Sequence, residues 1–154
     1  MYGEPRIRMT RLLENAYTGN NTVKVEAGLG WRSGERVAFA PTTMRYTHSD
    51  YATIETYDNA TGSLTLKTAL LHYHYGAATS TASNYNGVDM RGEVYLLSRN
   101  IKISGYDSEA WGCNIVTSDF IEITAVLRKG NTYMNNVEIY NCSQYDTYKA
   151  AIRF

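Results

Sequence analysis

Residues 92–105 read Gly92-Glu93-Val94-Tyr95-Leu96-Leu97-Ser98-Arg99-Asn100-Ile101-Lys102-Ile103-Ser104-Gly105. The pattern is typical of two short strands joined by a polar corner, because side chains alternate between the two faces of a strand. Val94 and Leu96 share one face, and Ile101 and Ile103 resume an apolar face after the corner. Asn100 suits the corner, since asparagine tolerates the left-handed conformation of a sharp bend.

The corner and its strand recur 36 residues later. Asn136-Val137-Glu138-Ile139-Tyr140 repeats the pattern of Asn100-Ile101-Lys102-Ile103-Ser104. A repeated corner-and-strand unit of this period is typical of stacked coils in a β-solenoid. We therefore predict that Asn100 and Asn136 are equivalent structural corners. We also predict that each coil has neighbouring coils as its partners, from the same chain or from other subunits.

The rest of the chain predicts more strands than helices. Alternating or β-branched segments occur at residues 6–13, where the alternation is weak, and at residues 22–26, 36–40, 52–56, 63–67, 120–124 and 150–154. Residues 58–62 are typical of a tight turn, and residues 76–87 are small, polar and aperiodic, which predicts a loop insertion. We expect residues 1–154 to form one β-rich segment.

Length and composition narrow the class of protein. The chain has 154 residues, and its 15 basic residues balance its 15 acidic ones, which gives no electrostatic basis for nucleic-acid binding. No apolar run is long enough to span a bilayer, so we expect any membrane attachment to lie outside this segment. Residues 1–6 lack the apolar core of a signal peptide, and residues 150–154 form an uncapped strand. We expect an internal segment of a longer chain.

Two features bear on the cellular compartment. Asn-x-Ser/Thr acceptors for N-glycosylation begin at Asn20, Asn59 and Asn141, although so short a motif also arises by chance. Cys113 and Cys142 are an even pair, compatible with a disulfide and equally with two small buried apolar side chains. The sequence alone therefore decides neither whether the asparagines are glycosylated nor whether the cysteines are bonded.

The chain offers few candidates for chemistry. His72 and His74 lie two residues apart, so one face of a strand could present both to a metal, with His48 as a third ligand. The alternative is a polar strand end without metal. Glycoside hydrolysis needs two carboxyl groups held a few ångströms apart, one with a raised pKa. The candidates are Asp107, Glu109, Asp119 and Glu122, which form no convincing pair.

Tyrosines offer a second kind of surface, because an aromatic face with a polar tip suits stacking on sugar rings. The candidates are Tyr46, Tyr51, Tyr57, Tyr73, Tyr75 and Tyr85, for which the alternative is ordinary decoration of a β-surface. The sequence has no glycine-rich phosphate loop, Cys-x-x-Cys pair or nucleophile elbow, and it calls for no cofactor.

Several segments, taken in order, resemble one extracellular family. The opening Gly3-Glu4-Pro5 with Thr10-Arg11-Leu12, the turn at residues 30–37, the phrase at residues 93–101, and residues 136–139 with Gln144 and 151–154 carry the likeness. The family is the β-helix region that follows the G8 domain in fibrocystin, fibrocystin-L and the related cell-surface hyaluronan-degrading proteins. The likeness implies a right-handed parallel β-helix in a large, secreted or membrane-anchored glycoprotein of the cell surface or cilium.

The resemblance leaves two functions open. The first is a non-catalytic structural or adhesion segment that presents a β-helical surface to partners or glycans. The alternative is a polysaccharide-depolymerising hydrolase that acts on glycosaminoglycans such as hyaluronan. The chain departs from the family pattern at Gly30 and Glu35, where the family has aspartate, and at Arg153, where it has histidine. If that histidine takes part in the chemistry of the glycan-degrading members, its absence favours the first function.

Overall fold

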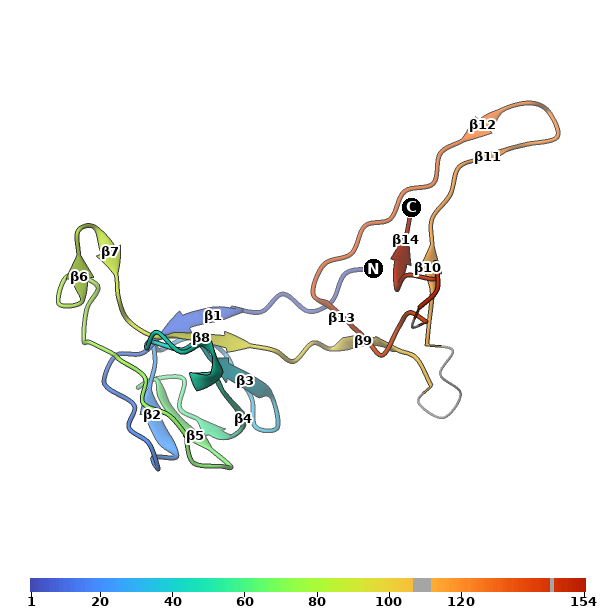
Figure 1. Ribbon diagram of the computed structural model, residues 1–154. Helices are drawn as coiled ribbons and strands as arrows, with labels where there is room; N and C mark the ends of the chain where they lie inside the picture. Colours follow the sequence, from blue (N-terminus) through green and yellow to red (C-terminus); the bar gives the residue numbers. More distant parts are fainter. Residues whose placement is uncertain (107–111, 145) are drawn as a thin grey trace. The chain divides into compact units, whose positions relative to one another are not determined.

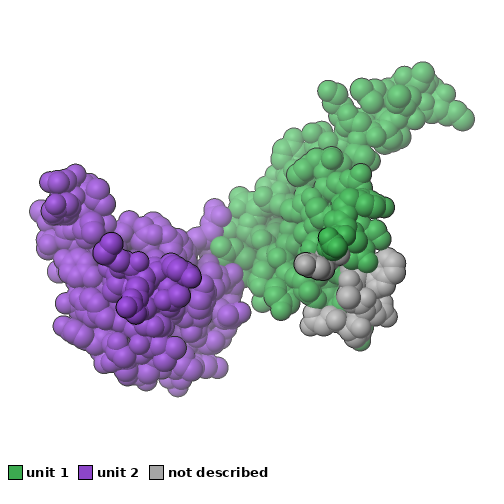
Figure 2. Space-filling model, in the orientation of Figure 1, with its two compact units in different colours: residues 1–5, 99–154 green, residues 6–98 purple. Residues whose placement is uncertain are grey.

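The computed structural model describes residues 1–106, 112–144 and 146–154 (Figure 1). The protein is all-β, as predicted, apart from one short 3-10 helix, η1 (Tyr46–His48). Two compact units are distinguished, residues 6–98 and residues 1–5 with 99–154, and each is described by itself (Figure 2). No helix in the described ranges is long and apolar enough to cross a membrane.

Residues 6–98 form a six-stranded sheet with the order β1-β8-β3-β4-β5-β2. Its strands are β1 (Met9–Arg11), β2 (Thr22–Lys24), β3 (Arg36–Phe39), β4 (Asp50–Tyr57), β5 (Ser63–Leu66) and β8 (Glu93–Leu96). Each of these strands lies within or overlaps a stretch that the sequence pattern assigns to strand. A separate short hairpin pairs β6 (Asn84–Tyr85) with β7 (Val88–Asp89), where the sequence predicts loop as far as residue 87.

This sheet curls, because the residues just after β1 hydrogen-bond to the end of β2 and the residue after it. Leu12 and Val25 form an antiparallel bridge, and the Leu13 N–H donates to the Lys24 carbonyl at 2.8 Å. Every second side chain then faces the interior, as strand geometry requires. The buried core comprises Leu12, Ala16, Val23, Val25, Leu29, Trp31, Val37, Phe39, Ala52, Ile54, Leu64, Leu66, Leu70, Val94 and Leu96. Burial of each large apolar side chain contributes about 1.5–3 kcal/mol.

The predicted parallel β-helix does not describe residues 6–98, since every strand pair in this sheet is antiparallel. Apolar alternation identifies the buried face of a strand but not the direction of its neighbour. The turn between β4 and β5 supplies the reason for one pair. The Asp58 carboxylate accepts from the Ala60 N–H at 2.9 Å and from the Thr61 hydroxyl at 2.6 Å. Such a short turn allows only a hairpin, because parallel strands need a long crossover.

The unit of residues 1–5 and 99–154 does contain parallel pairs. β9 (Ile101–Ser104) pairs in parallel with β13 (Val137–Tyr140), which aligns Ile101 with Val137 and Ile103 with Ile139. The register predicted from the repeat is therefore confirmed. β10 (Ile115–Val116) pairs in parallel with β14 (Ile152–Arg153). Beside them, β11 (Phe120–Ile121) and β12 (Leu127–Arg128) form an antiparallel hairpin within the stretch that includes the predicted 120–124 strand.

The two corner asparagines behave differently. Asn136 has a φ of 54°, in the left-handed region that the prediction requires. Asn100 lies outside that region and acts through its side chain, since its Oδ1 accepts from the Glu4 N–H at 2.8 Å. Residues 1–3 lie alongside residues 133–135, where the Gly3 N–H donates to the Asn135 carbonyl at 2.8 Å. Asn100 and Asn136 therefore occupy equivalent positions before paired strands, but their backbone conformations differ.

Candidate functional site

A polar hollow of about 290 Å³ lies in the unit of residues 6–98. One wall is the segment after β3, and the other is the end of β1 with the segment between β7 and β8. The lining residues are Arg11, Ala40, Pro41, Thr42, Thr43, Asp89, Met90, Arg91, Gly92 and Glu93. Charged side chains from β1, β7, β8 and the segment between β7 and β8 therefore border one hollow, which none of the sequence motifs predicts.

A second hollow of about 400 Å³ shares Thr42 and Met90 with the first. Its remaining lining residues are Tyr75, Ala82, Ser83, Asn84 and Tyr85. We call the two hollows together the hairpin groove, because the β6–β7 hairpin supplies residues to both. Met90 and Tyr85 are 49% and 69% exposed, so apolar and aromatic surface is accessible along the groove.

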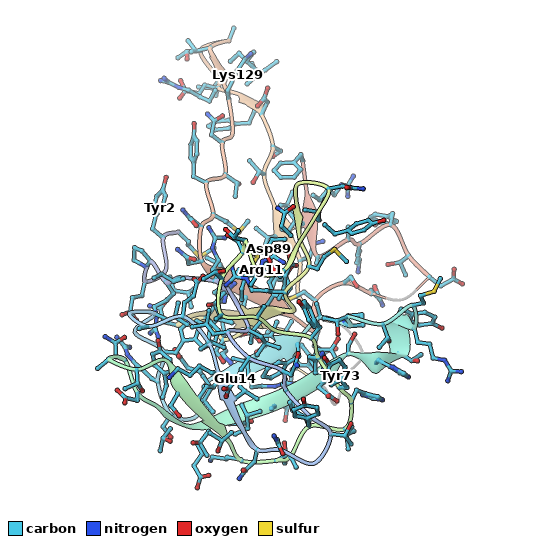
Figure 3. All side chains as sticks on the ribbon, turned by 90° about the vertical axis from the view of Figure 1, so that its left-hand side faces the viewer. Tyr2, Arg11, Glu14, Tyr73, Asp89 and Lys129 are labelled. Atoms are coloured by element: carbon cyan, nitrogen blue, oxygen red, sulfur yellow. A yellow bond between two sulfur atoms is a disulfide. The ribbon has the colours of Figure 1, made fainter. Side chains whose placement is uncertain are left out.

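Strand register positions the charged residues of the hairpin groove. Arg11 and Glu93 are direct cross-strand partners in the β1–β8 pair, and their side chains form an ion pair of 2.8 Å between Nη2 and Oε1. Arg11 also donates from Nη1 to the Arg91 carbonyl at 2.7 Å. Arg11 and Asp89 are neighbours in Figure 3. One arginine thus ties the segment between β7 and β8 to the edge of the sheet.

Arg91 and Asp89 form the second ion pair of the groove. The Arg91 side chain is 8% exposed, and its Nε and Nη2 donate to the Asp89 carboxylate at 3.0 and 2.8 Å. Ser83 adds a hydroxyl donor at 2.5 Å. The Arg91 guanidinium holds the pKa of Asp89 far below its ordinary value, although burial acts in the opposite direction. Asp89 is therefore a fixed anion at neutral pH.

This arrangement suits binding better than hydrolysis. A glycosidase needs one carboxyl group that stays protonated near neutral pH and a second that is ionised. Asp89 is an anion, and Glu93 has one oxygen on Arg11 and the other on the Tyr95 hydroxyl. The pKa values of Asp50, Asp58 and Asp89 all lie below the ordinary value for aspartate, so none of these three carboxyl groups keeps a proton near neutral pH.

The carboxyl candidates from the sequence lie in the other unit. Asp107 and Glu109 fall outside the described residues. Asp119 accepts from the Gly130 N–H at 2.9 Å, and Glu122 pairs with Arg128 at 2.7 Å across the β11–β12 hairpin. Both described side chains therefore hold their own hairpin together.

Two of the three histidine candidates, His72 and His74, contact one carboxylate. Asp50 accepts from His74 Nε2 at 3.0 Å and contacts His72 Nδ1 at 3.1 Å, while the His48 ring stacks on His72 with centroids 4.5 Å apart. His74 is fully buried. Among the described residues, no group of three or more His, Cys, Asp or Glu side chains is arranged to hold a metal ion. The spacing of His72 and His74 thus places both on one side, where they reach Asp50.

The tyrosines of the sequence divide into three groups. Tyr75 and Tyr85 line the hairpin groove. Tyr57 donates to the Glu26 carbonyl at 2.8 Å, and Tyr73 donates to Asn15 at 2.9 Å, so both have structural roles. Tyr46 and Tyr51 are 85% and 64% exposed.

The compartment features are also visible in the structure. Cys113 and Cys142 are joined in a disulfide, which is the bonded alternative of the two that the sequence left open. The glycosylation candidates Asn20, Asn59 and Asn141 are all exposed. The Asn59 side chain also accepts from the Gly30 N–H at 2.9 Å. Glycosylation itself stays a prediction.

The sequence analysis did not predict the two ion pairs that border the hairpin groove, Arg11–Glu93 and Arg91–Asp89. Asp89, Arg91 and Glu93 alternate along the chain, and this Asp-x-Arg-x-Glu pattern is the signal that could have placed three charges on one face. Arg11 carries no comparable signal, because only the pairing of β1 with β8 brings it to Glu93.

Comparison with known proteins gives two kinds of similarity. The chain is 26% identical to human fibrocystin-L and 25% identical to the mouse protein, each over 150 residues, which is 94% of this chain and 4% of those proteins. A Dictyostelium discoideum protein is 33% identical over 91 residues, which is 54% of this chain and 8% of that protein. The chain therefore spans a small fraction of these relatives. No family profile matches it.

Among solved structures, two phage tailspikes are similar at low identity. The tailspike gp49 of Pseudomonas phage LKA1 has a TM-score of 0.43 and 11% identity over 64% of this chain and 16% of that chain. The Gp54 tailspike of Acinetobacter baumannii bacteriophage AP22, solved with a capsular saccharide, has a TM-score of 0.41 and 9% identity over 66% and 16%.

Proposed function

We propose that this chain is a non-catalytic segment of a large extracellular or cell-surface glycoprotein, and that its hairpin groove binds a glycan. The observation that carries the glycan proposal is the combination of fixed ion pairs with accessible aromatic surface in one groove. Arg11 and Arg91 hold Glu93 and Asp89 in place, and Tyr75 and Tyr85 line the adjoining hollow. Sugars are typically held by a few oriented polar groups and by apolar contact with a ring face.

The charges of the hairpin groove indicate the class of glycan. The two arginines balance Asp89 and Glu93, and each charge already has an opposite partner within 2.8 Å. A polyanion would gain little from such paired charges, and its approach to the two carboxylates would be unfavourable. A neutral saccharide can instead use the remaining acceptor and donor capacity of these groups. We therefore infer a neutral glycan as the ligand.

Three features support an extracellular context. The similarity to fibrocystin-L covers nearly the whole chain. The Cys113–Cys142 disulfide is typical of oxidising compartments. The acceptor asparagines Asn20, Asn59 and Asn141 are all exposed, as glycosylation requires.

The parallel strand pairs in the unit of residues 1–5 and 99–154 fit the parallel β-helix that the family resemblance implies. We propose that this unit belongs to a right-handed parallel β-helix. Its β9–β13 and β10–β14 pairs are both parallel, and each joins strands roughly one repeat apart in the chain. In a β-helix, successive coils stack so that equivalent side chains line one interior.

Depolymerisation of a glycosaminoglycan is the second candidate function. Asp89 and Glu93 border the same hollow, which is the observation that favours it. The low pKa of Asp89 opposes it, because a general acid must keep its proton near neutral pH.

One set of binding measurements tests the proposal. The protein is titrated with neutral oligosaccharides from a glycan-array screen and with hyaluronan oligosaccharides, and the chain length of hyaluronan is followed in parallel. We expect saturable binding of a neutral glycan and unchanged hyaluronan length. Tyr85→Ala should weaken binding, because it removes the most exposed aromatic face of the groove.

Tyr51→Ala is the matched control, since Tyr51 is similarly exposed but lies on β4 and lines neither hollow of the hairpin groove. Equal binding losses in the two variants would contradict the assigned groove. Shortening of hyaluronan would support the second candidate and overturn the first.

A further inference from the structure

The unit of residues 1–5 and 99–154 contains a buried acceptor that lacks a partner. Asn136 Oδ1 is buried, and it has no hydrogen-bond partner within residues 1–106, 112–144 and 146–154. A buried carbonyl oxygen without a donor is unfavourable, because it has lost its hydrogen bond to water and gained none in the protein. Such a group in a folded protein therefore calls for a partner that the described residues do not provide.

The equivalent residue of the previous repeat shows what kind of donor is missing. Asn100 precedes β9 as Asn136 precedes β13, and the two strands align residue by residue. Asn100 Oδ1 accepts a backbone N–H, that of Glu4, at 2.8 Å. Asn136 holds the equivalent register position, although its backbone conformation differs, so we expect its missing partner also to be a backbone N–H of an extended segment.

An apolar hollow lies beside the same residue. It has a volume of about 390 Å³ and is lined by Thr132, Met134, Asn135, Asn136, Val137, Ile139, Ile152 and Phe154. Val137 and Ile139 are the members of β13 that stack on Ile101 and Ile103. The stack of aliphatic side chains is thus covered on one side by β9 and opens into this hollow on the other.

The backbone of β13 is also available for pairing. Over the described ranges, β13 pairs with β9 alone, so the N–H and C=O groups of its other edge have no strand partner. An open edge beside an apolar hollow is a template for strand addition, in which backbone bonds give affinity and alternate side chains give specificity.

We propose that this surface binds one more parallel strand, which carries the same Asn-Ile/Val-x-Ile phrase as β9 and β13. Continuity with the β9–β13 pairing carries the choice of occupant, because a third unit at the same register repeats the existing contacts. Its apolar side chains enter the hollow over Val137 and Ile139. A backbone N–H of the same strand, or of a segment at its start, donates to Asn136 Oδ1.

A peptide supplies the test strand. The probe is the synthetic nonapeptide of residues 98–106, which contains the repeat phrase of β9. It is titrated into the full chain and followed by fluorescence polarisation and by amide chemical shifts. We expect saturable binding to one site, with shifts confined to residues 132–141 and 150–154. These shifts locate the site in the unaltered protein.

Two comparisons make the result specific. A peptide in which Ile101-Lys102-Ile103-Ser104 becomes Lys-Ile-Ser-Ile has the same composition but the opposite faces, and it should bind at least about tenfold more weakly. Asn136→Gly keeps the left-handed backbone and removes the acceptor, so it should weaken binding about tenfold. Asn86→Gly is the control, since Asn86 has a similar φ of 51° but lies in the β6–β7 turn.

The proposal is wrong if the native peptide does not bind, or if the face-swapped peptide or Asn136→Gly leaves the affinity unchanged. A second copy of the chain is the competing occupant. Sedimentation that shows a dimer whose interface shifts map to β13 alone would indicate an antiparallel β13–β13 contact between two copies and overturn the proposal of a parallel strand.

Discussion

Asp50 and His74 are joined by a hydrogen bond of 3.0 Å between Oδ2 and Nε2, and the imidazole is fully buried. The other ring nitrogen of His74, Nδ1, faces the Ala40 carbonyl at 2.9 Å. Both ring nitrogens therefore have a polar partner, as a buried imidazole requires. Asp50 also accepts from the His72 backbone N–H at 2.9 Å. One carboxylate therefore ties β4 to the segment after β5.

Stability in acid should depend on Asp50. Burial raises its pKa, but the hydrogen bonds from His74 and His72 outweigh burial, so the pKa lies below the ordinary 3.8. A lowered folded-state pKa gives stability that is complete above the unfolded value and lost as the pH falls through the folded value. Asp50→Asn should cost about 2 kcal/mol near neutral pH. It should also flatten the loss of stability below pH 4, measured by urea unfolding at several pH values.

Glu55→Gln is the control for this substitution, because Glu55 lies on the same strand and is exposed. We expect a change within about 0.5 kcal/mol. An acid profile of Asp50→Asn that is parallel to that of the unaltered protein would rule out the proposed role of the carboxylate.

Gly62 should tolerate no side chain. It has a φ of 75°, and a Cβ there would overlap the Val25 carbonyl oxygen. Gly19 has a φ of 88° but open space around the same position. Gly19→Ala should therefore cost only the backbone strain, about 1–2 kcal/mol. Gly62→Ala should lower the free energy of unfolding by about 1–3 kcal/mol more than Gly19→Ala does. The added Cβ would push the Val25 backbone away from Gly62, although the Val25 N–H donates to the Gly62 carbonyl. Equal midpoints of thermal unfolding would contradict this account.

The disulfide should stabilise one unit selectively. It closes a loop with a sequence separation of 29 between Cys113 and Cys142, both in the unit of residues 1–5 and 99–154. Replacement of both cysteines by alanine should cost this unit about 3–4 kcal/mol, since the unfolded loop regains its freedom. Amide hydrogen exchange measures each unit separately. Protection should fall in β9 and β13 and persist in β3, β4 and β8; equal losses in both units would disprove the selectivity.

The repeat was readable from the sequence because its information is local. Matching phrases 36 residues apart align Ile101 with Val137 and Ile103 with Ile139, as the structure has them. The antiparallel direction of β3, β4 and β8 was not readable, since alternation is the same for both directions of pairing. The candidate site was even harder to predict from the sequence. Arg11 meets Glu93, and Asp50 meets His74, only after the sheet has formed, and neither contact leaves a pattern in nearby residues.

The last prediction concerns the pH dependence of the hairpin groove. The Arg91 guanidinium donates to both oxygens of Asp89 and keeps its pKa far below the ordinary value. A lowered pKa means that the anion and its stabilising ion pair persist as the pH falls through 5 and are lost only in strong acid. Glycan affinity should therefore be constant between pH 5 and 8. A hydrolase would instead show a bell-shaped activity profile set by an acid and a base.

Arg91→Lys tests the cause of this behaviour. Lysine keeps the charge but cannot donate two parallel hydrogen bonds, so the pKa of Asp89 should rise toward its ordinary value. The free energy of unfolding of the protein should fall by about 1–3 kcal/mol. The pH below which glycan binding is lost should rise. Carboxyl carbon-13 shifts of Asp89 measure the titration directly. Arg36→Lys, on β3 and outside the groove, is the control. An Asp89 titration that is the same in Arg91→Lys and the unaltered protein would show that Arg91 does not set the charge of this groove.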